Sequence, residues 1–261
     1  STANTIGSTE KLAVDAGAGT DTLVIGDAND VNTAADGARY TGFEALDVSA
    51  AQDMSLIAGI ESVAIAGDSI TLSNMSATQA ANVSADATAD ALTMTLKTAT
   101  GTSDVASITA ASETATTNVS LTDLAVDNFE TLNVAFTTGT AGTQSTLDLV
   151  ANKADELTAL NITGSADVLL NVAANVLDVT AVTIDASALT GKFEIVDDSG
   201  TLKSGSKVIG SAQADTIAVD DTTGTSYEGG AGKDAFTTAA ATISATGSND
   251  TSLDGGADED T

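Results

Sequence analysis

Glycine and aspartate recur at fixed positions in a nine-residue pattern near both ends of the chain. The pattern is G-G-x-G-x-D-x-U-x, in which U is a large apolar residue. Residues 229–237 match every specified position, and residues 16–24 match all but the first. Residues 25–33 follow in direct tandem, residues 210–218 keep the first glycine, the aspartate and the apolar residue, and residues 255–261 begin a further copy.

This spacing can build an oxygen-lined cage for a hard metal ion. Glycine permits the positive φ of a sharp turn, which gathers backbone carbonyls, and the aspartate adds a carboxylate to the same loop. Ca²⁺ takes about 6–8 oxygen ligands and suits such a cage better than the smaller Mg²⁺. We therefore predict Ca²⁺ as the cofactor. The positions predicted to form its sites are Gly17, Gly19, Asp21, Asp27, Asp30, Asp215, Asp220, Gly229, Gly230, Gly232, Asp234, Asp258 and Asp260.

The same stretches have a simpler interpretation, in which Gly-Gly-x-Gly segments are flexible linkers and their aspartates are solvated. The number of copies and the direct tandem at residues 16–33 favour metal sites instead. Lys233 stands inside the best copy, at an x position that we expect to point outward.

The charge balance excludes several classes of function. The 261 residues include 8 Lys and Arg against 37 Asp and Glu, a net charge of −29, with a pI of about 4.1. Nucleic-acid binding needs a basic face that so few cations cannot form. Without His and Cys, the chain has no His-dependent triad, H-E-x-x-H protease site or Cys/His zinc site. High acidity with 3% aromatic residues is also typical of disorder, which stays an alternative for the metal-free chain.

Apolar residues alternate with small polar ones in short segments through the middle of the chain. Residues 42–49, 59–66 and 128–135 share the order small, apolar, Glu, x, apolar, x, apolar, small, and residues 156–163 are a looser copy. This period of two is typical of half-buried strands. Further strands are predicted at 69–73, 92–96, 167–172, 175–184 and 193–196, with a short helix within 76–91.

These strands predict an all-β fold, namely a β-solenoid of the parallel β-helix or β-roll kind with calcium-binding nonapeptide turns. Glu44 and Glu61 lie 17 residues apart (61 − 44), a plausible length for one coil. The absence of Pro fits strands that each need their N–H donors for a neighbour on either side. Glu44, Glu61, Glu130 and Glu156 are interpreted as equivalent repeat positions at a structural corner or solvated ridge, not as catalytic groups.

The chain is predicted to contain calcium-binding coils at 1–33, a solenoid body at 34–205 and further calcium-binding coils at 206–261. It begins with Ser, and its last nonapeptide stops before the apolar position, so we expect a segment of a longer protein. No run approaches the about 18 apolar residues of a membrane helix, and no Sec signal is visible, so no membrane insertion is expected.

The nonapeptides resemble those of the RTX (repeat-in-toxin) family of calcium-binding proteins. The strand repeats of the middle, with segments such as 183–191, are similar to the body of RTX-type bacterial surface-layer (S-layer) proteins. This resemblance implies type I secretion, a calcium-dependent β-solenoid, and self-assembly into a two-dimensional lattice on the outer-membrane polysaccharide of a Gram-negative cell. The expected location is therefore the extracellular cell surface.

Three other functions stay open from the sequence. A large RTX adhesin would use the same calcium chemistry to stiffen a stalk. An enzyme acting through carboxylates is possible in principle, although no G-x-S-x-G elbow is present, and we expect no enzymatic activity. Ice binding by a flat threonine array has weak support in Thr93, Thr95, Thr98 and Thr100.

Overall fold

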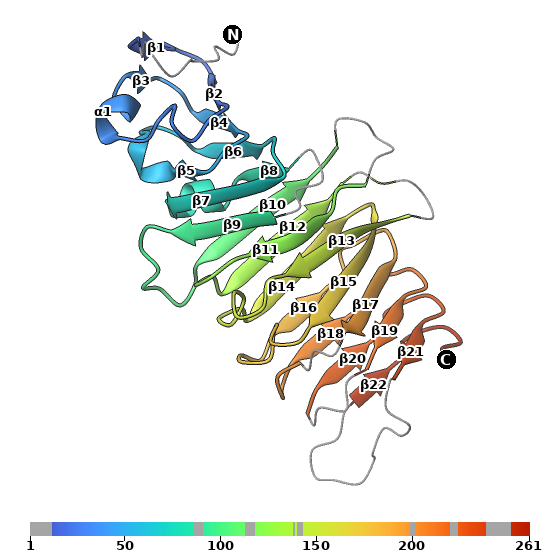
Figure 1. Ribbon diagram of the computed structural model, residues 1–261. Helices are drawn as coiled ribbons and strands as arrows, with labels where there is room; N and C mark the ends of the chain where they lie inside the picture. Colours follow the sequence, from blue (N-terminus) through green and yellow to red (C-terminus); the bar gives the residue numbers. More distant parts are fainter. Residues whose placement is uncertain are drawn as a thin grey trace.

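The chain folds into a parallel β-solenoid whose coils stack from one end to the other (Figure 1). The computed structural model describes residues 12–85, 91–112, 118–137, 139, 143–198, 202–219, 224–238 and 252–261. The predicted all-β solenoid is confirmed, and the helices of the described part are short: α1 (Ala34–Gly37), α2 (Ala77–Ala80) and the 3₁₀ helix η1 (Met54–Leu56). None of these described helices has the length and apolar character needed to cross a membrane.

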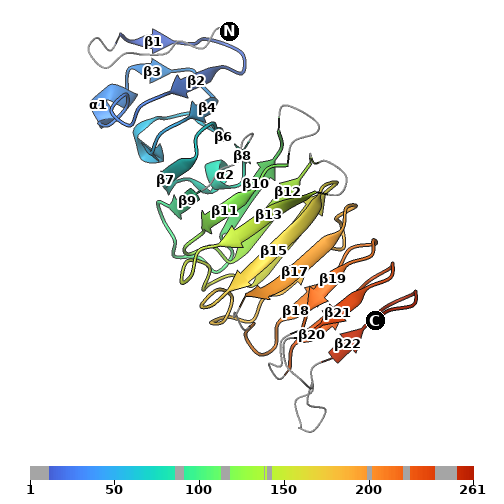
Figure 2. The ribbon, with the colours of Figure 1, turned by 45° about the vertical axis from the view of Figure 1, so that its right-hand side comes forward.

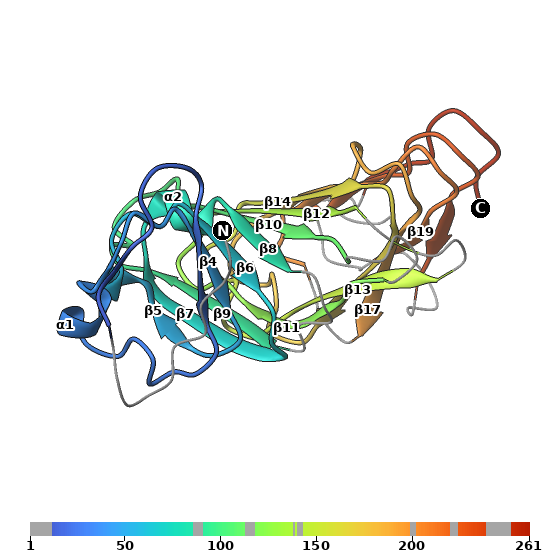
Figure 3. The ribbon, with the colours of Figure 1, turned by 90° about the horizontal axis from the view of Figure 1, so that it is seen from above.

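Two large sheets form the walls of the solenoid, on opposite sides of a shared interior (Figure 3). The 11-stranded sheet contains, in spatial order, β2 (Thr22–Ile25), β4 (Ala45–Val48), β6 (Ser62–Ile65), β8 (Val83–Ala85), β10 (Val105–Ala110), β12 (Thr131–Phe136), β14 (Ala159–Gly164), β16 (Thr183–Asp185), β18 (Lys207–Ile209), β20 (Ser226–Glu228) and β22 (Ser252–Asp254). The 9-stranded sheet, which faces the viewer in Figure 2, contains β5 (Gln52–Asp53), β7 (Ser69–Met75), β9 (Ala91–Leu96), β11 (Leu121–Ala125), β13 (Gln144–Leu149), β15 (Asp167–Ala173), β17 (Phe193–Asp198), β19 (Thr216–Ala218) and β21 (Ala235–Thr237). A small third sheet pairs β1 (Val14–Asp15) with β3 (Tyr40–Thr41).

Strands of the two large sheets alternate along the chain, so the polypeptide turns twice in each coil. We call the segments that lead out of the 11-stranded sheet forward turns, such as residues 210–215 between β18 and β19. The segments that lead into the 11-stranded sheet are return turns, such as residues 42–44 before β4. Turns of one kind stack on one another because the strands beside them pair in register.

The length of a coil varies along the solenoid. Ala45 pairs with Ser62, so Glu44 and Glu61 are one coil apart, as the sequence predicts. Val134 pairs with Ile162, which makes that coil 28 residues long (162 − 134). The strands keep their register, so the turns absorb the difference in length.

Alternation of side chains builds a narrow core between the two sheets. Leu46, Val63, Val83, Ile108 and Val134 form one inward column through successive strands and are at most 3% exposed. Complete burial of such a side chain stabilises the fold by about 1.5–3 kcal/mol. The intervening positions are more exposed and carry mostly small or polar residues.

An outward amide ladder runs across three strands of the 11-stranded sheet. Asn161 Nδ2 donates to Asn133 Oδ1 at 2.8 Å, and Asn133 Nδ2 donates to Ser107 Oγ at 3.0 Å. Parallel, in-register pairing places these residues one above the other, so equal outward side chains form a continuous row of hydrogen bonds.

One prediction of local structure needs correction. Residues 175–184 are not one strand: Asn175 and Leu177 have φ of 61° and 57°, which extended backbone excludes, and β16 begins only at Thr183. The buried residues Val176 and Leu177 fill the interior of a turn, and this produces an alternation that resembles a strand. The prediction of a short helix within 76–91 is confirmed by α2, and β8 begins at Val83.

Candidate metal centre

Three six-residue forward turns stack at the C-terminal end of the solenoid, drawn in orange and red in Figure 1. They span residues 210–215, 229–234 and 255–260, and each follows a strand of the 11-stranded sheet. The N–H of Gly210 donates to the carbonyl of Glu228, and the N–H of Gly229 donates to the carbonyl of Asp254, both at 2.8 Å. The predicted nonapeptide residues of this region are therefore brought together, one turn above the next.

The aspartates that end these turns form a ladder between coils. Oδ1 of Asp215 accepts the N–H of Phe193 at 2.8 Å, and Oδ1 of Asp234 accepts the N–H of Asp215 at 2.9 Å. Oδ1 of Asp260 in turn accepts the N–H of Asp234 at 3.0 Å. Each carboxylate thus ties its own coil to the coil before it through one oxygen.

The second carboxylate oxygen has different surroundings in adjacent turns. Oδ2 of Asp215 accepts the N–H of Ser211 at 2.5 Å, and Ser211 Oγ donates to Oδ1 at 2.8 Å. Oδ2 of Asp234 is buried and has no hydrogen-bond partner, in a residue that is only 1% exposed. A buried carboxylate oxygen without a partner is costly in free energy, so this atom marks a place for a ligand.

The first glycine of each turn leaves room for oxygen atoms. A Cβ added to Gly229 would overlap Oδ2 of Asp234 and lie 2.8 Å from the carbonyl oxygen of Gly255. A Cβ added to Gly210 would overlap the carbonyl oxygen of Gly229. In each case the space beside the glycine Cα is bounded by a carboxylate oxygen of the same turn and a carbonyl of the next.

The other glycines of the middle turn are equally constrained. Gly230 and Gly232 have φ of 108° and 116°, and a Cβ on either would overlap a carbonyl oxygen of the turn below, from Ser211 and Gln213 respectively. Asp258 Oδ2 accepts the N–H of Gly232 at 3.1 Å. This stack fits a hard cation that takes carboxylate and carbonyl oxygens together.

Electrostatics in the stack also favour a cation. Burial raises the pKa of Asp215, and the charge of Asp234 adds to the rise. Burial likewise raises the pKa of Asp234, with the charges of Asp260 and Asp258 adding to it. Positive charge placed between these turns would relieve both effects.

Carboxylates alone do not complete a coordination shell. Among the described residues, no group of three or more His, Cys, Asp or Glu side chains is arranged to hold a metal ion. The ladder provides one aspartate per coil, so any ion in the stack would also need backbone carbonyls or water. Asp220, predicted as a further ligand, lies outside the described residues.

The two N-terminal nonapeptides are not stacked on one another. Asp21 precedes β2 in a return turn, whereas Asp30 follows β2 in a forward turn, so these carboxylates lie at opposite ends of one strand. Oδ2 of Asp30 accepts the N–H of Asp27 at 3.1 Å. Hydrogen bonds from the backbone and side chain of Asn29 lower the pKa of Asp27.

Gly17 and Gly19 form the turn before Asp21, with φ of 88° and 135°. This turn lies against Gly42, the next return turn, where a Cβ would be 3.0 Å from the N atom of Gly17. The neighbouring turn is shorter and is not a nonapeptide, so Asp21 meets a different residue, Glu44, in the next coil.

Two glutamates of the strand repeats have a role in the return turns. Glu44 Oε2 accepts the N–H of Asp21 at 3.0 Å, and Glu130 Oε2 accepts the N–H of Asp104 at 2.6 Å. The interpretation of Glu156 as an equivalent position is wrong: Thr131 pairs with Ala159, which places Thr158 opposite Glu130. Asp104 was missed as a candidate, although it directly precedes an alternating segment, as Asp21 does.

Lys233 is exposed, with its Nζ 3.4 Å from Glu259 Oε2 of the next coil. The prediction that this lysine points outward is therefore confirmed. Such an exposed ion pair contributes little to stability.

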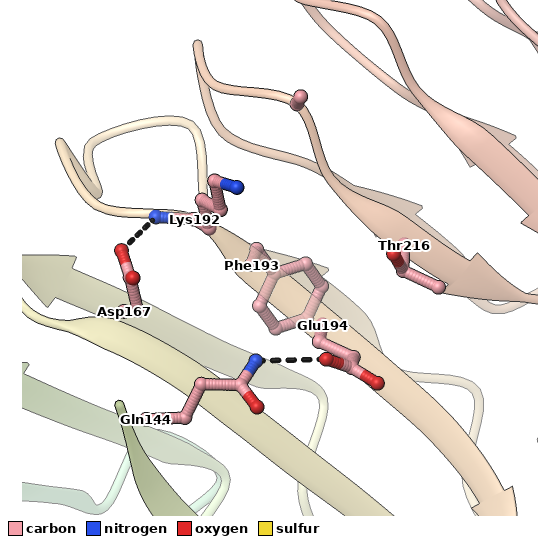
Figure 4. A pocket seen from close by; sticks show the side chains of 7 residues that line it. Gln144, Asp167, Lys192, Phe193, Glu194 and Thr216 are labelled. Carbon is pink, nitrogen blue, oxygen red and sulfur yellow. Dashed lines mark hydrogen bonds between the residues drawn. The ribbon is translucent and has the colours of Figure 1, made fainter. Parts of the chain in front are cut away.

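Two surface pockets lie along the 9-stranded sheet. One of about 250 Å³, shown in Figure 4, is crossed by a hydrogen bond of 2.8 Å from Gln144 Nε2 to Glu194 Oε2, and beside it the N–H of Lys192 donates to Asp167 Oδ1 at 2.9 Å. The other pocket, of about 580 Å³, contains Asp148. Burial raises the pKa of Asp148, a hydrogen bond from Asn171 opposes the rise, and the charge of Asp123 adds to it.

Comparison of the chain with protein-family models, with curated proteins and with solved structures gives no match. The chain is a two-sheet parallel β-solenoid that carries a stack of oxygen-lined turns at one end.

Proposed function

We propose that this chain is a structural segment of a bacterial surface layer, in which Ca²⁺ stabilises the solenoid and copies assemble into a two-dimensional lattice. The buried, partnerless Oδ2 of Asp234 inside the stack of forward turns carries this proposal. It supports the calcium part because an oxygen-only environment of carboxylates and carbonyls is what a hard divalent cation requires.

The ion would be held between successive forward turns. Asp215, Asp234 and Asp260 supply carboxylates, and the carbonyls beside Gly210 and Gly229 supply neutral oxygens. When bound, Ca²⁺ supplies positive charge to a chain of net charge −29, which otherwise repels itself in the compact state. Folding and calcium binding are coupled, because ligands one coil apart meet only in the folded solenoid.

The surface role follows from the same coupling. Extracellular calcium modules typically bind at about 10⁻⁴–10⁻³ M, which leaves their sites empty in the cytosol and filled after export. We propose type I secretion and an extracellular cell-surface location on this basis and on the nonapeptide resemblance. Outer-membrane polysaccharide is the proposed partner besides the chain itself.

Regular outward faces support a packing role more than a catalytic one. Small side chains in register, such as the ladder of Asn161, Asn133 and Ser107, give the 11-stranded sheet a regular outer surface. Glu44 and Glu130 accept backbone N–H groups, which supports a structural role for them. We propose no enzymatic activity for this chain.

The continuous length of the solenoid (Figure 1) also supports a second candidate, a calcium-stiffened stalk of an RTX-type adhesin. Electron microscopy of the purified chain with and without Ca²⁺ separates the two. The surface-layer proposal expects ordered two-dimensional patches that appear only with Ca²⁺. Single rods without lateral order at every protein concentration would contradict the lattice and favour the stalk.

A further inference from the structure

Two return turns place an aspartate one coil away from a glutamate in the same manner. In the first turn Glu44 Oε2 accepts the N–H of Asp21 at 3.0 Å. In the second Glu130 Oε2 accepts the N–H of Asp104 at 2.6 Å. The aspartate and glutamate are 23 residues apart in the first pair and 26 residues apart in the second. The two pairs lie several coils from each other, so the arrangement is built twice.

Backbone hydrogen bonds show that the two Asp–Glu pairs, which we call corners, share one geometry. The carbonyl of Asp21 accepts from both Glu44 N, at 3.2 Å, and Ala45 N, at 3.1 Å. The carbonyl of Asp104 accepts in the same way from Glu130 N, at 3.0 Å, and Thr131 N, at 3.1 Å. In each corner the carbonyl of the aspartate already accepts two hydrogen bonds. The side-chain carboxylates are therefore the oxygens that remain to bind a ligand.

Each aspartate keeps one oxygen that the protein does not satisfy. Oδ2 of Asp21 is buried without a hydrogen-bond partner, in a residue only 8% exposed, and Oδ2 of Asp104 is also buried without a partner. Leaving a buried carboxylate oxygen unpaired is unfavourable, because the oxygen loses its hydration and gains no hydrogen bond in return.

The hydrogen bond from the aspartate N–H to the glutamate explains only the glutamate of each pair. Glutamate is needed to accept the N–H of the preceding coil, but that bond uses no atom of the aspartate side chain. Asp21 follows a turn whose Gly19 would carry a Cβ 3.6 Å from Oδ2, and Asp104 follows Gly101, where a Cβ would lie 3.2 Å from either carboxylate oxygen. In both turns a glycine therefore lies next to the aspartate carboxylate.

We propose that each Asp–Glu corner binds one divalent cation, with Ca²⁺ the best fit to its oxygen-only donors. The ion takes Oδ2 of the aspartate, the glutamate carboxylate of the next coil and water, and two carboxylates balance its charge. These sites lie in the return turns, away from the forward-turn stack. Asp104 and Glu130 belong to no nonapeptide, so the proposal does not rest on the calcium stack at the C-terminal end.

Single substitutions Glu44→Gln and Glu130→Gln test the proposal at each corner. Glutamine keeps an oxygen to accept the aspartate N–H but removes the charge that a cation needs. Equilibrium dialysis against Ca²⁺, with metal analysis of the retained protein, should show one ion fewer per chain for each variant. Glu156→Gln, at an exposed glutamate outside the register position, is the matched control and should leave the number unchanged.

An unchanged number of bound ions in either single variant would overturn the assignment at that corner. The glutamate would then have only a structural role, as the acceptor of the aspartate N–H. Asp234→Asn is run alongside, because it weakens binding in the forward stack and not in the return turns. If Asp234→Asn loses bound ions while Glu44→Gln and Glu130→Gln keep theirs, this proposal fails and the calcium stack stands. If only the two glutamate variants lose ions, the calcium stack fails and this proposal stands.

A measurement on the unmodified protein covers the case in which a variant does not fold. Mn²⁺ added in small amounts to the Ca²⁺-loaded, isotope-labelled chain should broaden the amide signals of Asp21 and Asp104 through exchange into the corners. Sharp signals for both amides, while amides of the forward turns broaden, would contradict the proposal without any substitution.

Discussion

The backbone N–H of Asp215 donates to Oδ1 of Asp234, 2.9 Å away and 19 residues further along the chain. The same bond recurs in the next coil, between Asp234 N and Asp260 Oδ1, across 26 residues. Because Oδ1 is used to join the coils, only Oδ2 of Asp234 is left for a ligand, and it has no partner in the protein. One side chain therefore serves both the stacking of coils and the candidate metal centre.

Asp234→Asn should weaken calcium binding more than Asp47→Asn. Asparagine keeps an oxygen to accept the N–H of Asp215 but removes the charge at the stack, whereas Asp47 lies on β4, far from the forward turns at the C-terminal end. We expect the Kd of the weakened site to rise by about tenfold, or about 1.4 kcal/mol. Calorimetry that gives equal effects for the two substitutions would place the sites elsewhere.

Gly229→Ala should damage the forward stack, whereas Gly26→Ala should not. A Cβ at Gly229 overlaps Oδ2 of Asp234, but a Cβ at Gly26 meets no atom within 4 Å. Overpacking of this kind costs about 1–3 kcal/mol. Thermal unfolding in Ca²⁺ should show a lower midpoint for Gly229→Ala alone, and similar midpoints for both variants would contradict the close approach of Asp234 Oδ2 to that glycine.

Acidification should stabilise the metal-free protein as far as the stack is concerned. Burial raises the pKa of Asp215 and of Asp234, so the folded chain binds more protons than the unfolded chain. The free energy of unfolding then falls as pH rises from about 4 through the raised folded pKa values.

With Ca²⁺ bound, the sign reverses, because the ion holds both carboxylates in their charged form and stability is lost as pH falls. Thermal midpoints measured in chelator and in Ca²⁺ as the pH falls from neutral toward about 4 should therefore move in opposite directions. Parallel pH profiles in the two conditions would contradict an ion at Asp215 and Asp234.

Ser211→Ala should make the solenoid more dependent on calcium. The serine Oγ donates to Asp215 Oδ1 at 2.8 Å, and losing this hydrogen bond in a buried site costs about 1 kcal/mol in the metal-free state. A bound cation would replace the lost interaction at Asp215 Oδ1. The difference between the unfolding midpoints with and without Ca²⁺ should therefore be larger than in the unmodified chain. A difference equal to that of the unmodified chain would mean that the ion does not reach Asp215.

The solenoid could be predicted from the sequence because its strands show a local alternation of apolar and small polar residues. The repeat of one short coil, in which Ala45 pairs with Ser62, is also visible in the sequence. Which carboxylates meet could not be predicted in the same way. Asp21 and Asp30 stand nine residues apart in tandem copies, yet β2 separates them. Asp215 and Asp234 are further apart in sequence but adjacent in space.

The reason is that variable turns set the length of each coil, and the sequence pattern does not record it. The same limit explains residues 175–184, where a turn with buried Val176 and Leu177 carries a strand-like alternation. It also explains Glu156, which lies two residues before the position that is in register with Glu130.

The most direct test of the central claim is a chelator titration followed by circular dichroism and size-exclusion chromatography. If Ca²⁺ bound between the forward turns stabilises the solenoid, its removal should lower the strand signal or the unfolding midpoint and disperse the assemblies, and re-addition of Ca²⁺ should restore them. Strand signal, unfolding midpoint and assembly state that all stay unchanged after complete removal of Ca²⁺ would contradict the account.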